Sequence, residues 1–439
     1  MKKVCASAFV VSGIVVSQAA MADFVRDSKA TLNIKNAYEN IDFRSGAAAP
    51  SKTEEWGQAY ILDFQSGYTD GVVGFGVDAL GLWGIRLDSG GTTSKANRTR
   101  NPGTMFPLES DNSAVDQYGS IGLTAKAKVS KTVLKVGTLQ PQLPVIRTNN
   151  GRLLPQSYQG GQITSQDISG LTFTAGKINE VKSRVSTNWE GMRINGGTQL
   201  SNEFYYGGGD YAVTKGLTLS YYYGNLKDYY KQNFFGLLHS YKFGEGVFKT
   251  DLRYFNSDSD GENGSNARFA SAGYYSGSTT PTRGKVDNNL WSGFFSYTIY
   301  GHTLGFGYQR SNGESDFPSL NQGDGSDAYI YTDAMLGRFG RSGERTWFGR
   351  YSYDFAALGV SGLIAGMNYY SGDHVRTSSG DKSEWERDLS LGYVVQSGSL
   401  KGLSLTWRTA VFRTAVVPSS SFRDQDENRI IINYPLSIL

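Results

Sequence analysis

The feature that most constrains this chain is a regular alternation of apolar and polar side chains. In residues 72–88, Phe75, Val77 and Trp83 share one face, whereas Asp78 and Arg86 lie on the other. A period of two residues is that of a β-strand, and an apolar face about 9 to 11 residues long spans a bilayer. The pattern returns in residues 121–129, 403–411 and 430–438. The pattern favours the membrane-spanning strands of an outer-membrane barrel over the strands of a large secreted β-protein.

The first 22 residues predict a secretory signal peptide. Lys2 and Lys3 precede an apolar run over residues 4–16, and Ala20 and Ala22 form a small-x-small cleavage site. The only cysteine, Cys5, lies in this segment. We therefore expect a mature chain of one domain, residues 23–439, without a disulfide.

Composition fits an all-β protein, either a large secreted one or an outer-membrane barrel. A formal net charge of only +3 over 439 residues argues against a nucleic-acid binder, which needs a clustered basic excess. Beyond the signal there is no apolar run as long as the ~18 residues of a membrane helix. The abundance of Gly, Tyr and Phe with few Pro suits both classes, and the alternation favours the transmembrane antiparallel β-barrel.

Short turns set the number of strands. Eight turn-forming stretches separate alternating segments: residues 68–71, 130–131, 169–170, 214–216, 244–246, 300–301, 356–359 and 397–402. They predict eighteen strands if the chain begins and ends on one side, provided that a short strand covers roughly residues 161–168. The long connections then fall on the extracellular side: residues 89–116, 138–161, 183–201, 257–287 and 312–344.

The connection over residues 138–161 is unusual because it carries three prolines and several apolar residues without a strand or helix pattern of its own. Pro141 and Pro144 stiffen it, and Arg147 and Arg152 add charge. The residues expected to anchor it are Val145, Ile146, Leu153 and Leu154. Loops of this length are usually functional. We expect it to fold into the barrel and narrow it; the alternative is a lid over the mouth.

The chain resembles the OprD family of substrate-specific outer-membrane channels over nearly its whole mature length. The matching blocks, in order, are DSKATLNIKNAYENIDFR, EEWGQAYILDFQSGYTDGVVGFGVDALG, LQPQLPV with NNGRLLPQSYQGG, NEFYYGGGDY, LTLSYYYGNLKDYYKQNFFGLLHSY and DENRIIINYPLSIL. The resemblance implies an eighteen-stranded barrel of monomeric type whose third extracellular loop folds inward. It also implies a ladder of basic residues that leads carboxylates through the constriction.

Basic residues on the polar face of the predicted strands are the candidate site residues. They are Lys35, Arg86, Lys126, Lys128, Lys135, Arg253, Arg350, Arg408 and Arg429. A charge facing lipid near the midplane costs roughly 2 to 4 kcal/mol, so these side chains are expected to face water. The alternative for any one of them is an ordinary polar wall. The resemblance assigns the ladder itself to Lys35, Arg44, Arg408, Arg413 and Arg429, with Lys35 where the family often has Arg.

The loop near residues 323–344 is the candidate selectivity loop. The resemblance compares Arg338 with a position that is acidic in family members taking basic amino acids. This implies a preference for anionic over cationic solutes, although Asp333 or Asp327 could supply an acidic pocket. A solvated loop charge is the alternative.

We therefore expect a passive channel, not an enzyme, in the outer membrane of a Gram-negative bacterium. Its expected solutes are small carboxylate-bearing or zwitterionic molecules, and its other partners are outer-membrane lipid and assembly machinery. No metal or cofactor is expected, because His239, His302 and His374 are isolated. The alternatives are a structural or adhesive barrel without selective flux, and an outer-membrane hydrolase, for which no nucleophile and histidine can be paired.

Overall fold

The computed structural model describes residues 24–45, 51–90, 100, 102–273, 284–320, 327–416 and 423–439. The signal peptide expected at residues 1–22 lies outside this part of the chain. Among the described residues, no helix is long and apolar enough to cross a membrane.

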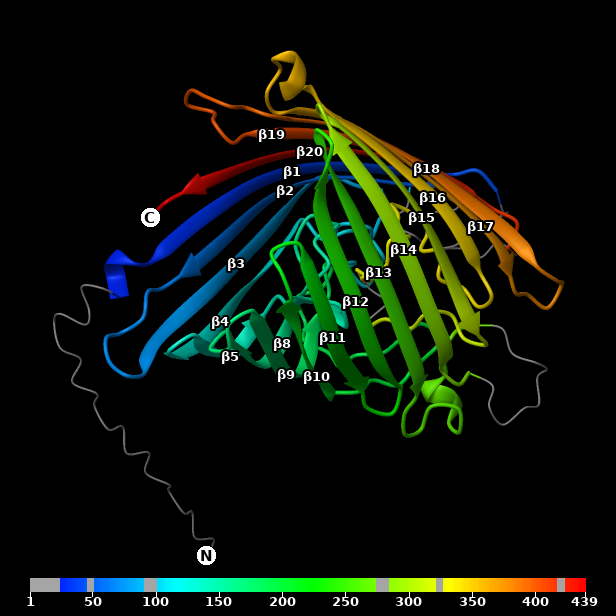
Figure 1. Cartoon of the computed structure of the whole chain (residues 1–439), viewed down its shortest axis with the longest axis horizontal. Helices are drawn as coiled ribbons and strands as arrows, with labels where there is room; N and C mark the ends of the chain where they lie inside the picture. Colours follow the sequence, from blue (N-terminus) through cyan, green and yellow to red (C-terminus); the bar gives the residue numbers. More distant parts are fainter. Residues whose placement is uncertain are drawn as a thin grey trace, which may run out of the picture.

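Nearly all the regular structure is β-strand (Figure 1). The strands of the first half are β1 (Lys29–Phe43), β2 (Lys52–Gln65), β3 (Gly74–Asp88), β4 (Gln117–Val129), β5 (Thr132–Leu139), β6 (Gln142–Leu143), β7 (Ile146–Arg147), β8 (Ser157–Ser165), β9 (Leu171–Lys182), β10 (Phe204–Ala212) and β11 (Leu217–Leu226). The remaining elements are β12 (Tyr230–Phe243), β13 (Gly246–Ser259), η1 (Ala267–Phe269), β14 (Asp287–Ile299), β15 (His302–Gly313), β16 (Arg345–Asp354), η3 (Phe355–Leu358), β17 (Leu363–Val375), β18 (Lys382–Val394), β19 (Ser404–Thr414) and β20 (Gln425–Ser437).

One antiparallel sheet of eighteen strands closes on itself. Each strand pairs with the next along the chain, and β1 pairs with β20 from Thr31↔Ser437 to Phe43↔Gln425. Figure 1 shows these first and last strands side by side. Closure removes the sheet edges, which is what allows strands to cross a membrane. The expected eighteen-stranded barrel is therefore confirmed.

All eight predicted short turns join consecutive strands of the barrel. Tyr300 and Gly301 both have positive φ, 49° and 82°, which suits a tight two-residue hairpin turn. We call this end of the barrel the short-turn end and the opposite one the long-loop end; in outer-membrane barrels these face the periplasm and the exterior.

The predicted short strand at residues 161–168 starts four residues and ends three residues too late. Strand β8 covers Ser157–Ser165 instead. Gly160 lies inside this strand, where an added Cβ would lie 2.1 Å from the Lys177 carbonyl oxygen of the neighbouring strand. The backbones approach closely there, which is a known reason for glycine inside a strand.

The two faces of the sheet differ as the alternation predicts. Phe75, Ile121, Phe306 and Trp347 are among the many large apolar side chains exposed on the outer face. The residues that alternate with these exposed positions point inward, and they include Lys35, Arg408 and Arg429. Because paired residues of antiparallel strands share a face, Arg408 and its partner Arg429 point the same way.

Candidate functional site

Three neighbouring strands, β19, β20 and β1, bring basic side chains together on the inner face. Arg408 of β19 and Arg429 of β20 are direct cross-strand partners. Lys35 lies on the next strand, paired with Asn433 of β20. Three of the five predicted ladder residues thus form one wall, because strands that are far apart in sequence become neighbours when the barrel closes.

Arg429 is held by carboxylates. Its guanidinium pairs with Glu427 and lies 3.4 Å from Glu39, and both glutamates are buried. It also donates to the Gly151 carbonyl at 3.4 Å. A buried ion pair of this kind fixes geometry more than it supplies free charge.

Arg408 differs from its neighbour. It lines the same internal cavity, yet among the described residues its guanidinium makes no hydrogen bond or ion pair. Its five donors are therefore available to a solute, in the planar arrangement that matches a carboxylate.

The loop between β5 and β8, residues 140–156, contacts inward-facing residues of several strands. Lys35 donates to the Arg152 carbonyl, and the Arg152 guanidinium lies 2.8 Å from Glu39. Leu153 and Leu154 are buried in a cluster with inward-facing Ala37, Ala59 and Leu82. These contacts attach one end of the loop to β1, β2 and β3.

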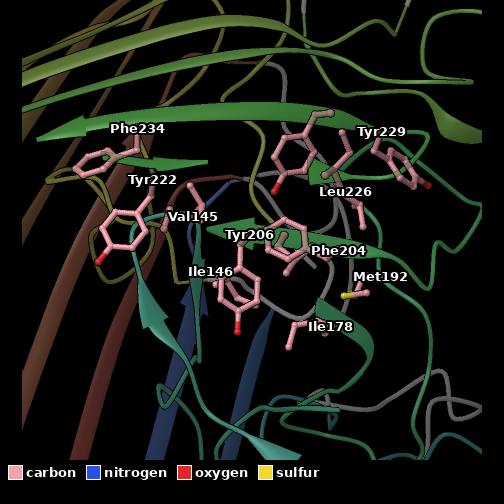
Figure 2. Close-up of a cluster of buried hydrophobic side chains, with 14 of the residues drawn as sticks. Val145, Ile146, Ile178, Met192, Phe204, Tyr206, Tyr222, Leu226, Tyr229 and Phe234 are labelled. Carbon is pink, nitrogen blue, oxygen red and sulfur yellow. The ribbon is translucent and has the colours of Figure 1, made fainter. Parts of the chain in front are cut away.

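The other part of this loop reaches a different wall. Val145 and Ile146 are buried against Tyr206 of β10 and Tyr222 of β11, as Figure 2 shows. The intervening chain forms a small hairpin, β6 and β7, around Pro144. Pro141 accepts a hydrogen bond from the Thr148 amide at 2.8 Å, which closes the base of the hairpin. No strand was predicted here, because a pair of two-residue strands is too short to show a period.

The candidate selectivity loop, of which residues 327–344 are described, meets the β5–β8 loop. Arg147 lies 3.3 Å from Asp327, and burial raises the pKa of the Asp327 carboxyl. Arg338 lies 3.3 Å from Asp333 and donates to Ser319 at 2.8 Å. The predicted selectivity residues Asp333 and Arg338 therefore largely compensate each other's charge.

Acidic residues of β18 form a wall that the sequence analysis missed. Glu384, Glu386 and Asp388 are all buried on the inner face. Glu386 accepts hydrogen bonds from the backbone amides of Leu336 at 2.9 Å and Gly337 at 2.5 Å, and so anchors the selectivity loop. Three acidic residues at alternate positions of one strand would have predicted this wall from the sequence, because alternate residues share a face.

These walls and loops enclose a cavity of about 730 Å³. Its basic members are Arg152, Arg184, Arg338, Arg341, Arg350, Arg408 and Arg429, and its acidic members are Asp316, Asp327, Asp333, Glu384 and Asp388. Such a cavity can offer a small solute both cationic and anionic groups, as pores that select solutes do.

Two predicted ladder residues lie elsewhere. Arg44 and Arg413 each pair with Asp426 at 2.7 Å, and neither lines the cavity. Arg413 is the cross-strand partner of Trp385, one position away from inward-facing Glu384 and Phe412. Its register places it on the outer face, near the long-loop end. These two arginines therefore lie apart from the wall formed by Lys35, Arg408 and Arg429.

Comparisons with known proteins agree with this architecture. The family model described as outer membrane porin, OprD family, matches residues 22–438. The Porin-like protein GalP of Pseudomonas putida is 36% identical over 424 residues, covering 96% of this chain and 95% of the relative.

Solved structures from Pseudomonas aeruginosa show the same fold. OccK8 (OprE) is 52% identical with a TM-score of 0.86, covering 95% of this chain and 100% of that one. OpdK, solved with vanillate, is 34% identical with a TM-score of 0.81, covering 94% and 100%. The chain therefore belongs to the OprD family of outer-membrane porins, which are channels and not enzymes.

Proposed function

We propose that this channel passes small carboxylate-bearing solutes, and that the carboxylate binds Arg408 beside the basic wall of Lys35 and Arg429. The observation that carries the proposal is the unpaired guanidinium of Arg408 in a cavity whose other described charges are mostly paired. Charge-assisted bidentate hydrogen bonds favour such a group as a carboxylate ligand.

A relative supports the same solute class. OpdK was solved with vanillate, an aromatic carboxylate. The cavity here also contains Asp388 and Asp327, so a zwitterion with both a carboxylate and an ammonium group fits its charges. Because Arg338 and Asp333 pair with each other, Arg338 does not by itself give the cavity a preference for anions.

We also propose that the β5–β8 loop is the constriction. It joins the β1–β3 wall to the β10–β11 wall through two buried clusters, which supports a loop held across the lumen and not over its mouth. Residues 1–22 are proposed to be removed on export, with the barrel inserted by outer-membrane assembly machinery into lipid. N-terminal sequencing of the mature protein would test that cleavage follows Ala22.

The test of the carboxylate site is Arg408→Gln, with Arg413→Gln as a matched control on the same strand. Arg429 is unsuitable, because its replacement would leave Glu39 and Glu427 buried without their cation. A hydrogen bond to a charged group is worth about 1.5–3 kcal/mol, so uptake of benzoate into proteoliposomes should fall roughly tenfold or more.

Single-channel conductance in potassium chloride should fall much less for Arg408→Gln, since the pore stays open. Arg413→Gln should alter neither quantity. Equal losses of uptake and conductance, or normal benzoate uptake in Arg408→Gln, would contradict the proposal and indicate a channel without a carboxylate site.

A further inference from the structure

A second basic cluster lies at the short-turn end of the barrel. Inward-facing Lys126 and Lys128 of β4, Lys135 of β5 and Lys29 of β1 line a cavity of about 590 Å³ together with Tyr68. Its lining shares no residue with the cavity around Arg408. On β1, Lys29 lies ten positions before Glu39, the cross-strand partner of Arg429, roughly 33 Å along an extended strand. The two cavities therefore lie at different heights along the pore, with the second one nearer the short-turn end.

The centre of this cluster is an ion-pair network. Asp78 lies 2.6 Å from Lys126 and 3.0 Å from Lys135, so one carboxylate is shared by two ammonium groups. Lys126 also donates to the Ser66 carbonyl at 2.7 Å, and only 5% of its side chain is exposed. At Gly76 an added Cβ would lie 2.6 Å from the Lys126 side chain, so the glycine leaves room for it.

The other two lysines keep their charge available. Within the described part of the chain, neither Lys29 nor Lys128 has a carboxylate at ion-pair distance. Lys128 lies 5.5 Å from the centre of the Tyr68 ring, and Lys126 lies 4.7 Å from it. The remaining acids of the cavity are Asp27, which pairs with Arg26 at 3.4 Å, and the exposed Asp70 on the turn. The cavity is left with an excess of positive charge.

We propose that Lys29 and Lys128, supported by the Lys126–Asp78–Lys135 group, form a second binding site that takes the carboxylate of a solute leaving the pore. The site would hold the solute after it dissociates from Arg408, so that two weak sites in series lie on the path of the anion as it moves down its gradient towards the periplasm. This deepens the proposed function and rests on it, because it concerns the same solutes.

The test uses the double variant Lys29→Gln/Lys128→Gln. Its matched control is Lys215→Gln/Lys401→Gln, which removes the same charge from exposed positions in short turns outside the cavity. Neither Lys29 nor Lys128 holds an ion pair in the described structure, so the barrel should fold, and its heat-modifiable gel mobility would verify this.

Block of single-channel current by benzoate is measured from each side of a planar bilayer. From the short-turn side, the half-blocking concentration should rise by roughly fivefold or more in the cavity variant, the ratio expected for loss of a unit-charge contact in water. From the long-loop side it should stay unchanged, and the control should match the parent on both sides.

The proposed site would be wrong if the two double variants changed the half-blocking concentration equally. It would also be wrong if the Lys29→Gln/Lys128→Gln variant left block from the short-turn side unchanged. Tighter block by inorganic phosphate than by benzoate would overturn its assignment to a carboxylate. Failure of this proposal is separable from failure of the first, because Arg408→Gln should reduce uptake while leaving short-turn-side block intact.

Discussion

Arg152 of the β5–β8 loop and Glu39 of β1 form an ion pair of 2.8 Å deep inside the barrel, 113 positions apart in sequence. Glu39 is only 3% exposed and also lies 3.4 Å from Arg429. One carboxylate thus links the loop to the basic wall, so the shape of the cavity and its charge depend on the same residue.

Replacing Glu39 by Gln should release the loop. The change leaves Arg152 and Arg429 facing each other without their shared carboxylate, and breaking a buried pair typically costs about 3–5 kcal/mol. We expect larger single-channel conductance with more open-state noise. The control, Asp426→Asn, breaks ion pairs outside the cavity. Parental conductance in Glu39→Gln would contradict a loop held by this residue.

Glycine at position 57 makes room for the same loop. An added Cβ would lie 2.6 Å from Leu153 Cδ2 and 2.8 Å from Phe106. Gly57→Val should therefore push the loop inward at a cost of roughly 1–3 kcal/mol, the usual range for overpacking. Trypsin should cleave faster after Arg147 or Arg152. Gly349→Val is the control, because nothing lies within 4 Å of its added Cβ; equal cleavage rates would refute the argument.

The contact between Glu344 and Glu384 predicts a dependence on pH. Burial and the neighbouring Glu384 raise the pKa of the Glu344 carboxyl well above its usual value. The folded state then binds the proton more tightly than the unfolded state. Protonation of Glu344 therefore stabilises the folded state. This stabilisation is complete below the pKa of the unfolded state, about 4.3, and it is lost as pH rises through the pKa of the folded state.

We therefore expect the amides of residues 340–344 to exchange hydrogen faster at higher pH, after correction for the intrinsic rate. Glu344→Gln should keep slow exchange across this range, since the neutral amide cannot ionise. An identical pH profile in parent and variant would show that Glu344 does not control this segment. Asp333→Asn, on the same loop, serves as the control.

Arg253 anchors the selectivity loop by stacking. Its guanidinium lies 3.9 Å from the ring centres of both Tyr329 and Tyr331, and it contacts Asp251 through two nitrogens at 3.1 and 2.9 Å. Lysine keeps the charge but loses the planar fork. Arg253→Lys should lower the free energy of opening of the selectivity loop by about 1–2 kcal/mol.

The readout is hydrogen exchange in residues 328–338, which should become roughly five- to thirtyfold faster if local opening controls it. Arg387→Lys, on the exposed face of β18, is the control. Unchanged exchange in Arg253→Lys would mean that the β18 contacts to Leu336 and Gly337 hold the loop without Arg253.

Much of the barrel is determined by the sequence itself. The period of two, the eight turns and the inward direction of Lys35, Arg408 and Arg429 are local properties, because neighbouring residues of a strand must face opposite sides. The anchoring residues of the β5–β8 loop were also predictable, since Val145, Ile146, Leu153 and Leu154 are too apolar to remain in solvent.

Only the tertiary structure decided which charges are free. Arg408 and Arg429 look alike in sequence, but Glu39 reaches Arg429 only because β1 closes the barrel beside β20. Arg413 lies five positions after Arg408, so alternation already turns it to the outer face, but its pairing with Asp426 depends on the neighbouring strand β20. Alternation assigns a side chain to a face, whereas its partners come from strands and loops hundreds of residues away, which a local pattern cannot encode.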